Sequence, residues 1–266
     1  AIHESEPGSR CWIEADDNDA WFCYRPMQRF DQGGAQVEQF DLECLLQFVR
    51  LAGGWHWAEN VVSPSTEQVV AQIQNAGAED ADNVVTIAAQ AQVAWRRKTA
   101  RERADIMRAF AAEIRNQRQR LAELLTSEQG KLLKVALGEV DVCASFIEYA
   151  CDWARQMDGD IVKSDNPNEH IWIHKIPRGV GVAITAWNFP WALAGRKIGP
   201  ALIAGNTIVV KPTSETPLAT LELADIAKKV GLPDGVLNIV TGGGRTLGDE
   251  VNVLGVSERC TMADLL

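Results

Sequence analysis

The 266-residue sequence lacks several features that would each indicate a particular class of protein. It has no run of about 18 consecutive apolar residues, which a membrane-spanning helix requires. It also has no excess of positive charge, because 36 acidic residues outnumber 26 basic ones and the formal net charge is -10. Without a summed positive field, a broad surface for nucleic acid or for an anionic membrane is excluded. We therefore expect neither of those partners, and any phosphate recognition has to be local.

Cysteine is sparse, and the first ten residues lack the basic and then apolar pattern of a signal peptide. Six cysteines, with no Cys-x-x-Cys pair among them, are too few for a disulfide scaffold and lack metal-ligand spacing. We expect a cytoplasmic protein with free thiols and no metal site. The cysteines are Cys11, Cys23, Cys44, Cys143, Cys151 and Cys260.

Residues 1–46 carry weak structural signals. Four aromatic residues crowd between Trp12 and Tyr24, but no helical or strand periodicity is sustained. We expect this segment to be a poorly ordered N-terminal extension.

Between Val61 and Asp158 the pattern predicts helices. The clearest start is Thr99-Ala100-Arg101-Glu102, a capping box in which each end satisfies a backbone N–H of the other. An apolar stripe follows at the spacing of one helix face. We interpret the opposite, charged face as solvent-exposed helix surface and not as a binding patch. Its arginines are Arg101, Arg103, Arg108, Arg115, Arg118 and Arg120.

Two short extended pieces are predicted between Asp160 and His174, around a turn at 165–168. His170 and His174 would share a metal ion if the segment were helical. The intervening Ile171-Trp172-Ile173 favours a strand, in which four residues separate the two imidazoles by about 13 Å. We therefore predict a hairpin and no metal site.

From Arg178 onward strands and helices alternate. Three short apolar runs are typical of strands buried in a parallel sheet. They span Val180–Thr185, Thr207–Val210 and Val236–Val240. Helices are predicted between them, at Trp191–Gly205 with a tolerated Pro200, and from Thr216-Pro217 to Gly231. With right-handed crossovers, this βαβαβ order predicts an α/β fold with a doubly wound, Rossmann-like parallel sheet.

In such a sheet, ligands bind at the carboxyl ends of the strands, where three unusual loops occur. The loop Ala186-Trp187-Asn188-Phe189-Pro190-Trp191 carries large aromatic rings that no turn geometry needs. The loop at 211–215 reads Lys-Pro-Thr-Ser-Glu. The third contains Gly242-x-Gly244-x-x-x-Gly248, which permits close approach of a phosphate, although it is not the G-x-G-x-x-G fingerprint. Their coincidence at one edge predicts a ligand site.

Taken together, these stretches resemble the NAD(P)-dependent aldehyde dehydrogenase superfamily. The resemblance rests on AWNFPW, on GRKIGPALIAGNTIVVKP and on GLPDGVLNIVTGGG, with VVSPSTEQVVAQI, SEQGKLL and EYACDWARQMDGDIVKSD upstream in the same order. It covers Val61 to about Glu250. SDNPNEHIWIHKIPRGV and KPTSETPLATLEL are most similar to the lactaldehyde and glycolaldehyde dehydrogenases.

The resemblance implies roles for particular residues. Asn188 would donate its side-chain amide to the oxyanion of the substrate adduct. Trp187 and Phe189 would wall the cofactor and substrate passages, and Lys211 would bond the adenine-ribose hydroxyls. Lys197 matches a lysine near the active site. Gly242, Gly244 and Gly248 would line the dinucleotide groove.

The loop at 211–215 also bears on the choice between NAD and NADP as the cofactor. Many NAD-preferring relatives carry Glu three residues after the lysine, whereas this chain has Ser214 there and Glu215 one position later. An acidic residue at this place bonds the ribose hydroxyls and repels a 2′-phosphate. The shift predicts acceptance of NADP, unless the loop rearranges so that Glu215 reaches the ribose.

The resemblance fails at both ends of the chain. The family's Gly-Gln-x-Cys nucleophile and Glu-Leu-Gly-Gly base are absent from the sequence. Without a thiolate no covalent adduct forms, so the family implies oxidation of a small aldehyde but the chain alone is expected to be inactive. A chain truncated before the catalytic domain fits this pattern. Two alternatives stay open: a non-catalytic dinucleotide-binding or interaction protein that pairs with a full-length homologue, and a non-functional gene fragment.

The expected organisation has three parts. Residues 1–46 are an unmatched extension, residues 47–250 an incomplete cofactor-binding domain, and residues 251–266 an unmatched tail. Within the domain, the resemblance implies that 159–176 is an oligomerisation hairpin, which is consistent with a homo-oligomer.

Overall fold

The computed structural model describes residues 11–15, 20–24, 58–243 and 247. The chain divides into two compact units, Ala1–Ala58 and Glu59–Leu266. In the first, β1 (Cys11–Ala15) pairs antiparallel with β2 (Ala20–Tyr24), and Cys11 lies opposite Tyr24. The sequence analysis predicted no elements there. Whether the rest of 1–46 is ordered lies outside the described residues.

The second unit contains the predicted parallel sheet. Its strands are β7 (Val180–Ile184), β8 (Thr207–Lys211) and β9 (Leu237–Ile239), in the order β7-β8-β9. Both pairings are parallel, with Val182 opposite Val209 and Val209 opposite Asn238. All five residues of β8 are buried, which explains the apolar run Ile208–Val210 at its centre. The predicted βαβαβ order is confirmed.

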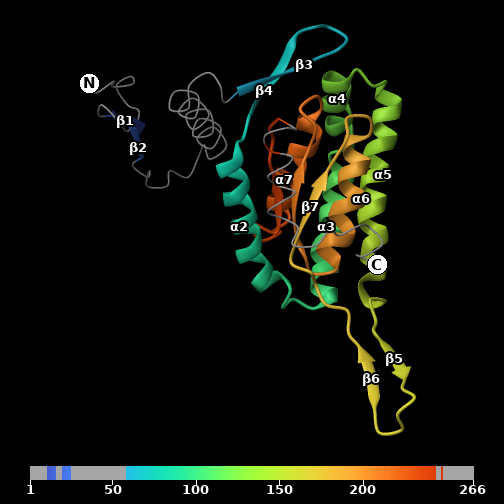
Figure 1. Ribbon diagram of the computed structural model, residues 1–266. Helices are drawn as coiled ribbons and strands as arrows, with labels where there is room; N and C mark the ends of the chain where they lie inside the picture. The colour runs from blue at the N-terminus through green and yellow to red at the C-terminus, as the bar shows by residue number, and fades with distance from the viewer. Residues whose placement is uncertain (1–10, 16–19, 25–57, 244–246, 248–266) are drawn as a thin grey trace, which may run out of the picture. The chain divides into compact units, whose positions relative to one another are not determined.

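Helices cover both faces of this sheet (Figure 1). The two crossover helices, α6 (Pro190–Ile203) and α7 (Pro217–Lys229), contact each other and the strands on one face. The helix α2 (Ala78–Trp95) packs on the other face, where the Thr207 hydroxyl donates to the Ala88 carbonyl at 2.9 Å. The helix α7 begins at Pro217, as predicted, whereas α6 begins at Pro190, one residue before the predicted Trp191, and continues through Pro200. The doubly wound arrangement is thus present.

Three further helices pack together and contact the two crossover helices. They are α3 (Ala100–Asn116), α4 (Arg118–Gln129) and α5 (Leu133–Asp152), followed by a 3-10 turn at Trp153–Arg155. Of these, α5 packs against α6, α4 against α7 and α3 against both. The Thr99–Glu102 capping box at the start of α3 is confirmed: the Thr99 amide donates to the Glu102 carboxylate at 2.7 Å, and the Thr99 side chain accepts from the Glu102 amide. The α5 and α6 backbones approach closely at Gly195 and Gly199.

Two predictions for the helical region are wrong. Residues near its start form the strands β3 (Ala58–Val62) and β4 (Val69–Gln74) and not helix. Arg103 is buried and not part of the solvated face, because its guanidinium donates to the carbonyls of Ile203, at 2.9 Å, and Lys98. It thereby satisfies a carbonyl near the end of α6 that the helix leaves unpaired.

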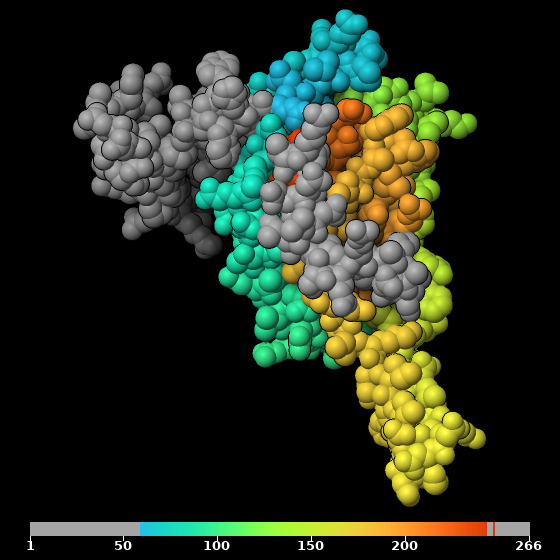
Figure 2. Space-filling view, in the orientation of Figure 1, coloured from blue at the N-terminus to red at the C-terminus, as the bar shows by residue number. Residues whose placement is uncertain are grey.

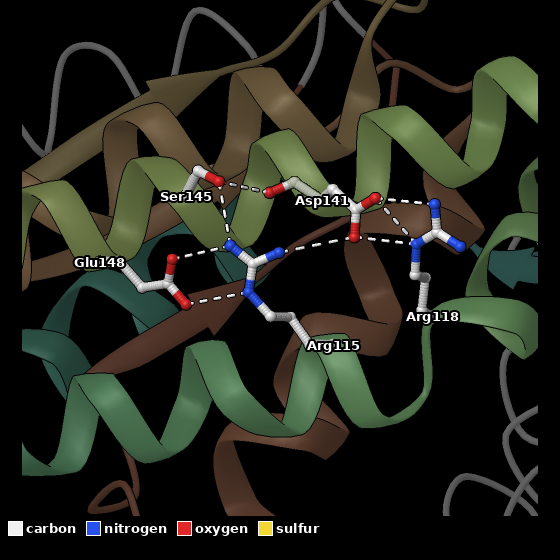
Figure 3. Close-up of polar contacts among 5 residues, drawn as sticks. All are labelled: Arg115, Arg118, Asp141, Ser145 and Glu148. Atoms are coloured by element: carbon white, nitrogen blue, oxygen red, sulfur yellow. Dashed lines mark hydrogen bonds and ion pairs between the residues drawn. The ribbon is translucent and has the colours of Figure 1, made fainter.

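The other arginines of that face lie at the surface, as predicted. Figure 3 shows Arg115 bridging to Glu148 at 2.7 Å and to Asp141 at 3.5 Å, while Arg118 contacts Asp141 at 2.7 Å. These ion pairs join α3 and α4 to α5. Because they are partly exposed, each contributes about 1 kcal/mol or less.

The hairpin predicted around 165–168 is also confirmed. It consists of β5 (Asp160–Lys163) and β6 (His170–Ile173), paired antiparallel with Asp160 opposite Ile173. The hairpin extends beyond the helices (Figure 2) and exposes 82% of Ile161 and 66% of Trp172. His170 lies in a strand, so the two histidines are not brought together as helix neighbours. Over the described ranges, no helix is long and apolar enough to cross a membrane.

Candidate functional site

The three unusual loops do lie at one edge of the sheet. After β7, the Thr185 amide donates to the Lys211 carbonyl at 3.1 Å, and the Thr213 amide donates to the Thr185 carbonyl at 3.2 Å. After β9, the Val240 amide donates to the Val210 carbonyl at 3.0 Å. These backbone bonds place the loops next to one another, as expected for consecutive strands of a parallel sheet.

Lys211 and Thr185 bring polar atoms into the buried base of this edge. Lys211 is buried at the end of β8, and its ammonium donates to the Pro212 carbonyl at 3.1 Å. Burial lowers the pKa of Lys211, and the nearby Glu59 opposes that effect. The Thr185 hydroxyl is buried and has no hydrogen-bond partner among the described residues. A buried polar group without a hydrogen-bond partner lowers the stability of the fold unless a ligand or water bonds it. The Thr185 hydroxyl and the remaining N–H groups of Lys211 therefore suit a ligand rich in hydroxyl groups.

The glycine loop is fixed against the segment that precedes α2. The Ala76 amide donates to the Thr241 carbonyl at 2.9 Å, and the Gly243 amide donates to the Asn75 side chain at 3.2 Å. A Cβ on Gly242 would lie 2.7 Å from the Ala76 carbonyl oxygen, so only glycine fits there. Gly242 is thus required by packing within the chain, whatever its role toward a ligand. Gly244 and Gly248 lie outside the described residues.

The side chains of the turn at 187–189 are largely accessible to solvent, and its hydrogen bonds to the protein are made by its backbone. Trp187 and Phe189 are about half exposed, and Asn188 is exposed. The Asn188 side chain has no hydrogen-bond partner in the part of the chain that the structure describes. Trp191, by contrast, is fully buried in the core, so one of the two tryptophans in the loop is there for packing.

Three residues that hold this turn were missed by the sequence analysis. They are Gln129, Lys131 and Glu139, at the end of α4, in the connection to α5 and on α5. The Lys131 ammonium donates to the Asn188 carbonyl at 2.8 Å, and the Glu139 carboxylate accepts from the Trp191 amide at 2.9 Å. Gln129 and Lys131 lie in the stretch SEQGKLL, which was quoted for the resemblance without any assigned role, and Glu139 lies outside it.

Buried glutamates occupy the N-termini of both crossover helices. Glu139 accepts from the first turn of α6, and Glu128 accepts from the amides of Leu218 and Ala219 in the first turn of α7. A carboxylate there satisfies amides that the helix leaves unpaired and complements the helix dipole. Burial nevertheless raises the pKa of Glu128 to about 7, against the lowering effect of the two amides.

The remaining candidates are placed as follows. Ser214 is half-buried and Glu215 is exposed, with the Glu215 amide 3.5 Å from the Thr213 hydroxyl. Lys197 lies half-buried on α6. Cys143 and Cys151 are free thiols buried in the core, and burial raises their pKa to about 12 and about 11. Neither thiol forms appreciable thiolate near neutral pH. The other cysteines lack described side chains.

Comparisons with known proteins agree on one family. A model of the aldehyde dehydrogenase family matches residues 56–253. The 3,6-anhydro-alpha-L-galactose dehydrogenase of Vibrio sp. (strain EJY3) is 72% identical over 201 residues, which cover 74% of this chain and 42% of that protein. The lactaldehyde dehydrogenase of Escherichia coli (strain K12) is 42% identical over 205 residues, which cover 77% of this chain and 42% of that protein.

Solved structures show the same relationship. The structure of 3,6-anhydro-L-galactose dehydrogenase in complex with NAP superposes with a TM-score of 0.72 at 70% sequence identity. The match covers 73% of this chain and 41% of that one. A structure of lactaldehyde dehydrogenase gives a TM-score of 0.71 at 41% identity, with the same coverage. The chain therefore spans about 42% of the length of the curated relatives it matches, and its fold is incomplete relative to theirs.

Proposed function

The chain belongs to the aldehyde dehydrogenase family, and we propose that it supplies the cofactor-binding part of an enzyme that oxidises a small aldehyde with NADP or NAD. The observation that carries the proposal is the edge of the sheet where the loops after β7, β8 and β9 meet, each with the residues that the family resemblance requires. When bound, the nicotinamide of the cofactor accepts a hydride. The residues of this chain would bind and orient that group.

The buried donors at this edge fit a dinucleotide. The Lys211 ammonium has donor capacity beyond its bond to Pro212, and the unpartnered Thr185 hydroxyl lies on the neighbouring strand end. We propose that Lys211 bonds a ribose of the cofactor. We further propose that the backbone of Gly242, Gly244 and Gly248 lies along the dinucleotide and that Trp187 borders it, because their loops share this edge. Asn188 is proposed as the oxyanion donor, since its amide is exposed and not used by the described protein.

Turnover needs a nucleophile and a base that the chain does not carry in the family's sequence contexts. Cys143 and Cys151 do not substitute for the nucleophile, because both are buried thiols with raised pKa values. We therefore propose that the chain by itself binds cofactor without oxidising aldehydes. Pairing with a full-length homologue is the alternative that its exposed β5–β6 hairpin favours, and a homo-oligomer would use the same surface. The proposed site of action is the cytoplasm.

The substrate of the whole enzyme is proposed from the sequence identity of this chain to two dehydrogenases. Identity to the anhydro-galactose dehydrogenase is 72%, against 42% to the lactaldehyde dehydrogenase. We therefore propose a sugar-derived aldehyde, and not lactaldehyde itself, as the substrate of the whole protein. Glycolaldehyde and lactaldehyde are the smaller aldehydes to compare in any assay.

Titration of the chain with NADPH tests the central proposal. We expect saturable quenching of the fluorescence of its nine tryptophans, at one equivalent per chain. Lys211→Met is expected to weaken this binding about 10- to 100-fold, because a charged hydrogen bond of about 1.5–3 kcal/mol is removed. Lys229→Met, which removes the exposed lysine of an ion pair with Glu113, is the matched control. No quenching by NADPH or NADH would refute cofactor binding, and steady reduction of NADP by the chain with an aldehyde would refute its inactivity.

A second prediction concerns the choice of cofactor. We propose that Ser214 admits the 2′-phosphate of NADP, because it is neutral and half-buried while Glu215 is exposed one residue further on. Ser214→Glu is expected to weaken NADPH binding about tenfold relative to NADH, through like-charge repulsion. Ser214→Gln has similar size without charge and serves as the control. Unchanged relative affinities in Ser214→Glu would show that this position does not set the preference.

A further inference from the structure

The peptide groups on both sides of Asn188 are held by side chains from the α4–α5 region. The Trp187 carbonyl, which belongs to the peptide before Asn188, accepts from the Gln129 amide at 2.6 Å and lies 3.4 Å from the Thr216 hydroxyl. The Asn188 carbonyl, which belongs to the peptide after it, accepts from Lys131 at 2.8 Å and from Gln129 at 3.1 Å. Because a peptide group is planar, fixing both planes at one Cα fixes the direction of its Cβ.

Lys131 and Glu139 form the buried part of this arrangement. The Lys131 ammonium is ion-paired with the Glu139 carboxylate, and their side chains are 12% and 0% exposed. The ammonium also lies 4.2 Å from the centre of the Phe189 ring, a favourable cation–π distance. Glu139 extends the arrangement to the first turn of α6 through the Trp191 amide. Each charge is thus satisfied by more than one partner, which a buried ion pair needs in order to be stable.

The side chain of Asn188 is left out of this network. The Asn188 carbonyl accepts hydrogen bonds from Gln129 and Lys131, and the Trp187 carbonyl before it accepts one from Gln129. The Asn188 side-chain amide, by contrast, makes no hydrogen bond to the described protein and is exposed. A structural asparagine in a turn would usually bond its own or a neighbouring backbone. Fixed peptides combined with an unused side chain are what a site needs to present one donor in one direction.

We propose that Gln129, Lys131 and Glu139 are positioning residues that orient the Asn188 side-chain amide toward the reacting carbonyl. This inference rests on the proposed function for the role of Asn188, but the orientation itself is a property of this chain. Within the described part of the chain, the three residues form no hydrogen bond to the Asn188 side chain and contact the backbone of the turn, with one further contact from Lys131 to the Phe189 ring, so they act on Asn188 through its backbone. Glu139, on the buried side, keeps the Lys131 ammonium against the carbonyl.

The test compares Lys131→Met, Lys131→Arg and Gln129→Ala with Lys229→Met in the full chain. Lys229→Met removes a lysine ion pair with Glu113 at the surface, away from the turn. Two quantities are measured: hydrogen exchange of the backbone amides of residues 187–189 and of Trp191, and the NMR signal of the Asn188 side-chain amide, assigned with Asn188→Ser. We expect Lys131→Met to speed exchange about tenfold and to narrow and shift the Asn188 signal as its motion increases. Lys131→Arg, which keeps the positive charge, should show the exchange rate and the Asn188 signal of the wild type.

A second variant, Gln129→Ala, tests the proposal even if Lys131→Met fails to fold. This variant removes a neutral donor from both carbonyls and should show the same changes in smaller degree. Exchange and Asn188 signals indistinguishable from those of Lys229→Met in both variants would overturn the proposal. NADPH titration of the same proteins separates it from the proposed function. If wild-type chain binds no cofactor, the function fails, while the exchange and NMR results still decide whether these residues orient Asn188.

Discussion

The variant Gly195→Val is expected to lose about 4 kcal/mol of unfolding free energy, the largest effect of any single substitution proposed for this chain. A Cβ on Gly195 would lie 2.8 Å from both the carbonyl oxygen and the sulfur of Cys143. One of those atoms is backbone, so the contact is not relieved by a rotamer change. Helices α5 and α6 would have to separate, opening the buried core they share.

Urea unfolding followed by circular dichroism measures this loss. The matched control is Gly138→Ala on α5, where an added Cβ meets nothing within 4 Å. That change should stabilise the chain by about 1 kcal/mol, because alanine is the better helix former. Gly195→Ala should lower the unfolding free energy, because the clash of the added Cβ with Cys143 outweighs the gain in helix propensity. Equal effects of alanine at the two positions would show that the helices are not packed as tightly as the structure has them.

The contrast between these glycines shows what could be predicted from the sequence. Patterns with a local cause were predictable. Pro217 begins a helix because its missing N–H costs nothing there, and the centre of the buried β8 is the apolar run Ile208–Val210. Gly195 and Gly138 both read as tolerated helix glycines, and only the position of Cys143 distinguishes them. Arg103 was misjudged for the same reason. Its charge suited an exposed face, and its bonds go to carbonyls 100 and 5 residues away.

The candidate site likewise has features that the local sequence predicts and features that depend on residues far away in the chain. The three loops were predictable because strand ends of a parallel sheet meet at one edge whatever the side chains are. The residues that hold the 187–189 turn were not, because Gln129 lies 58 residues before Trp187 and no periodicity connects them. The strands β3 and β4 were missed because apolar and polar residues do not alternate along them: the neighbours Val69 and Val70 are both apolar, and both are exposed in the structure. Sequence reasoning thus predicted the edge where the three loops meet and missed the residues that hold the 187–189 turn.

A second large effect is expected from pH. Glu128 has a pKa of about 7 in the folded chain, raised by burial above the ordinary value of 4.5. A group whose pKa is higher when folded binds its proton more tightly in the native state, so its contribution is fully present below pH 4.5. This stabilising contribution of Glu128 is lost as the pH rises from 4.5 toward 7. The difference between the two pKa values corresponds to about 3 kcal/mol of unfolding free energy.

Glu128→Gln should remove that dependence, because glutamine keeps an acceptor oxygen for the first turn of α7 and does not titrate. Unfolding free energies of wild type and variant, measured from pH 4.5 to 8, should therefore converge or cross as the pH rises. Glu123→Gln, at an exposed position on the same helix, is the control for losing a carboxylate there. Taking the difference between variant and wild type cancels the other titrating groups. A constant difference across the range would mean that the amides of Leu218 and Ala219 hold Glu128 ionised when folded, and that the charge at the N-terminus of α7 outweighs the cost of burying it.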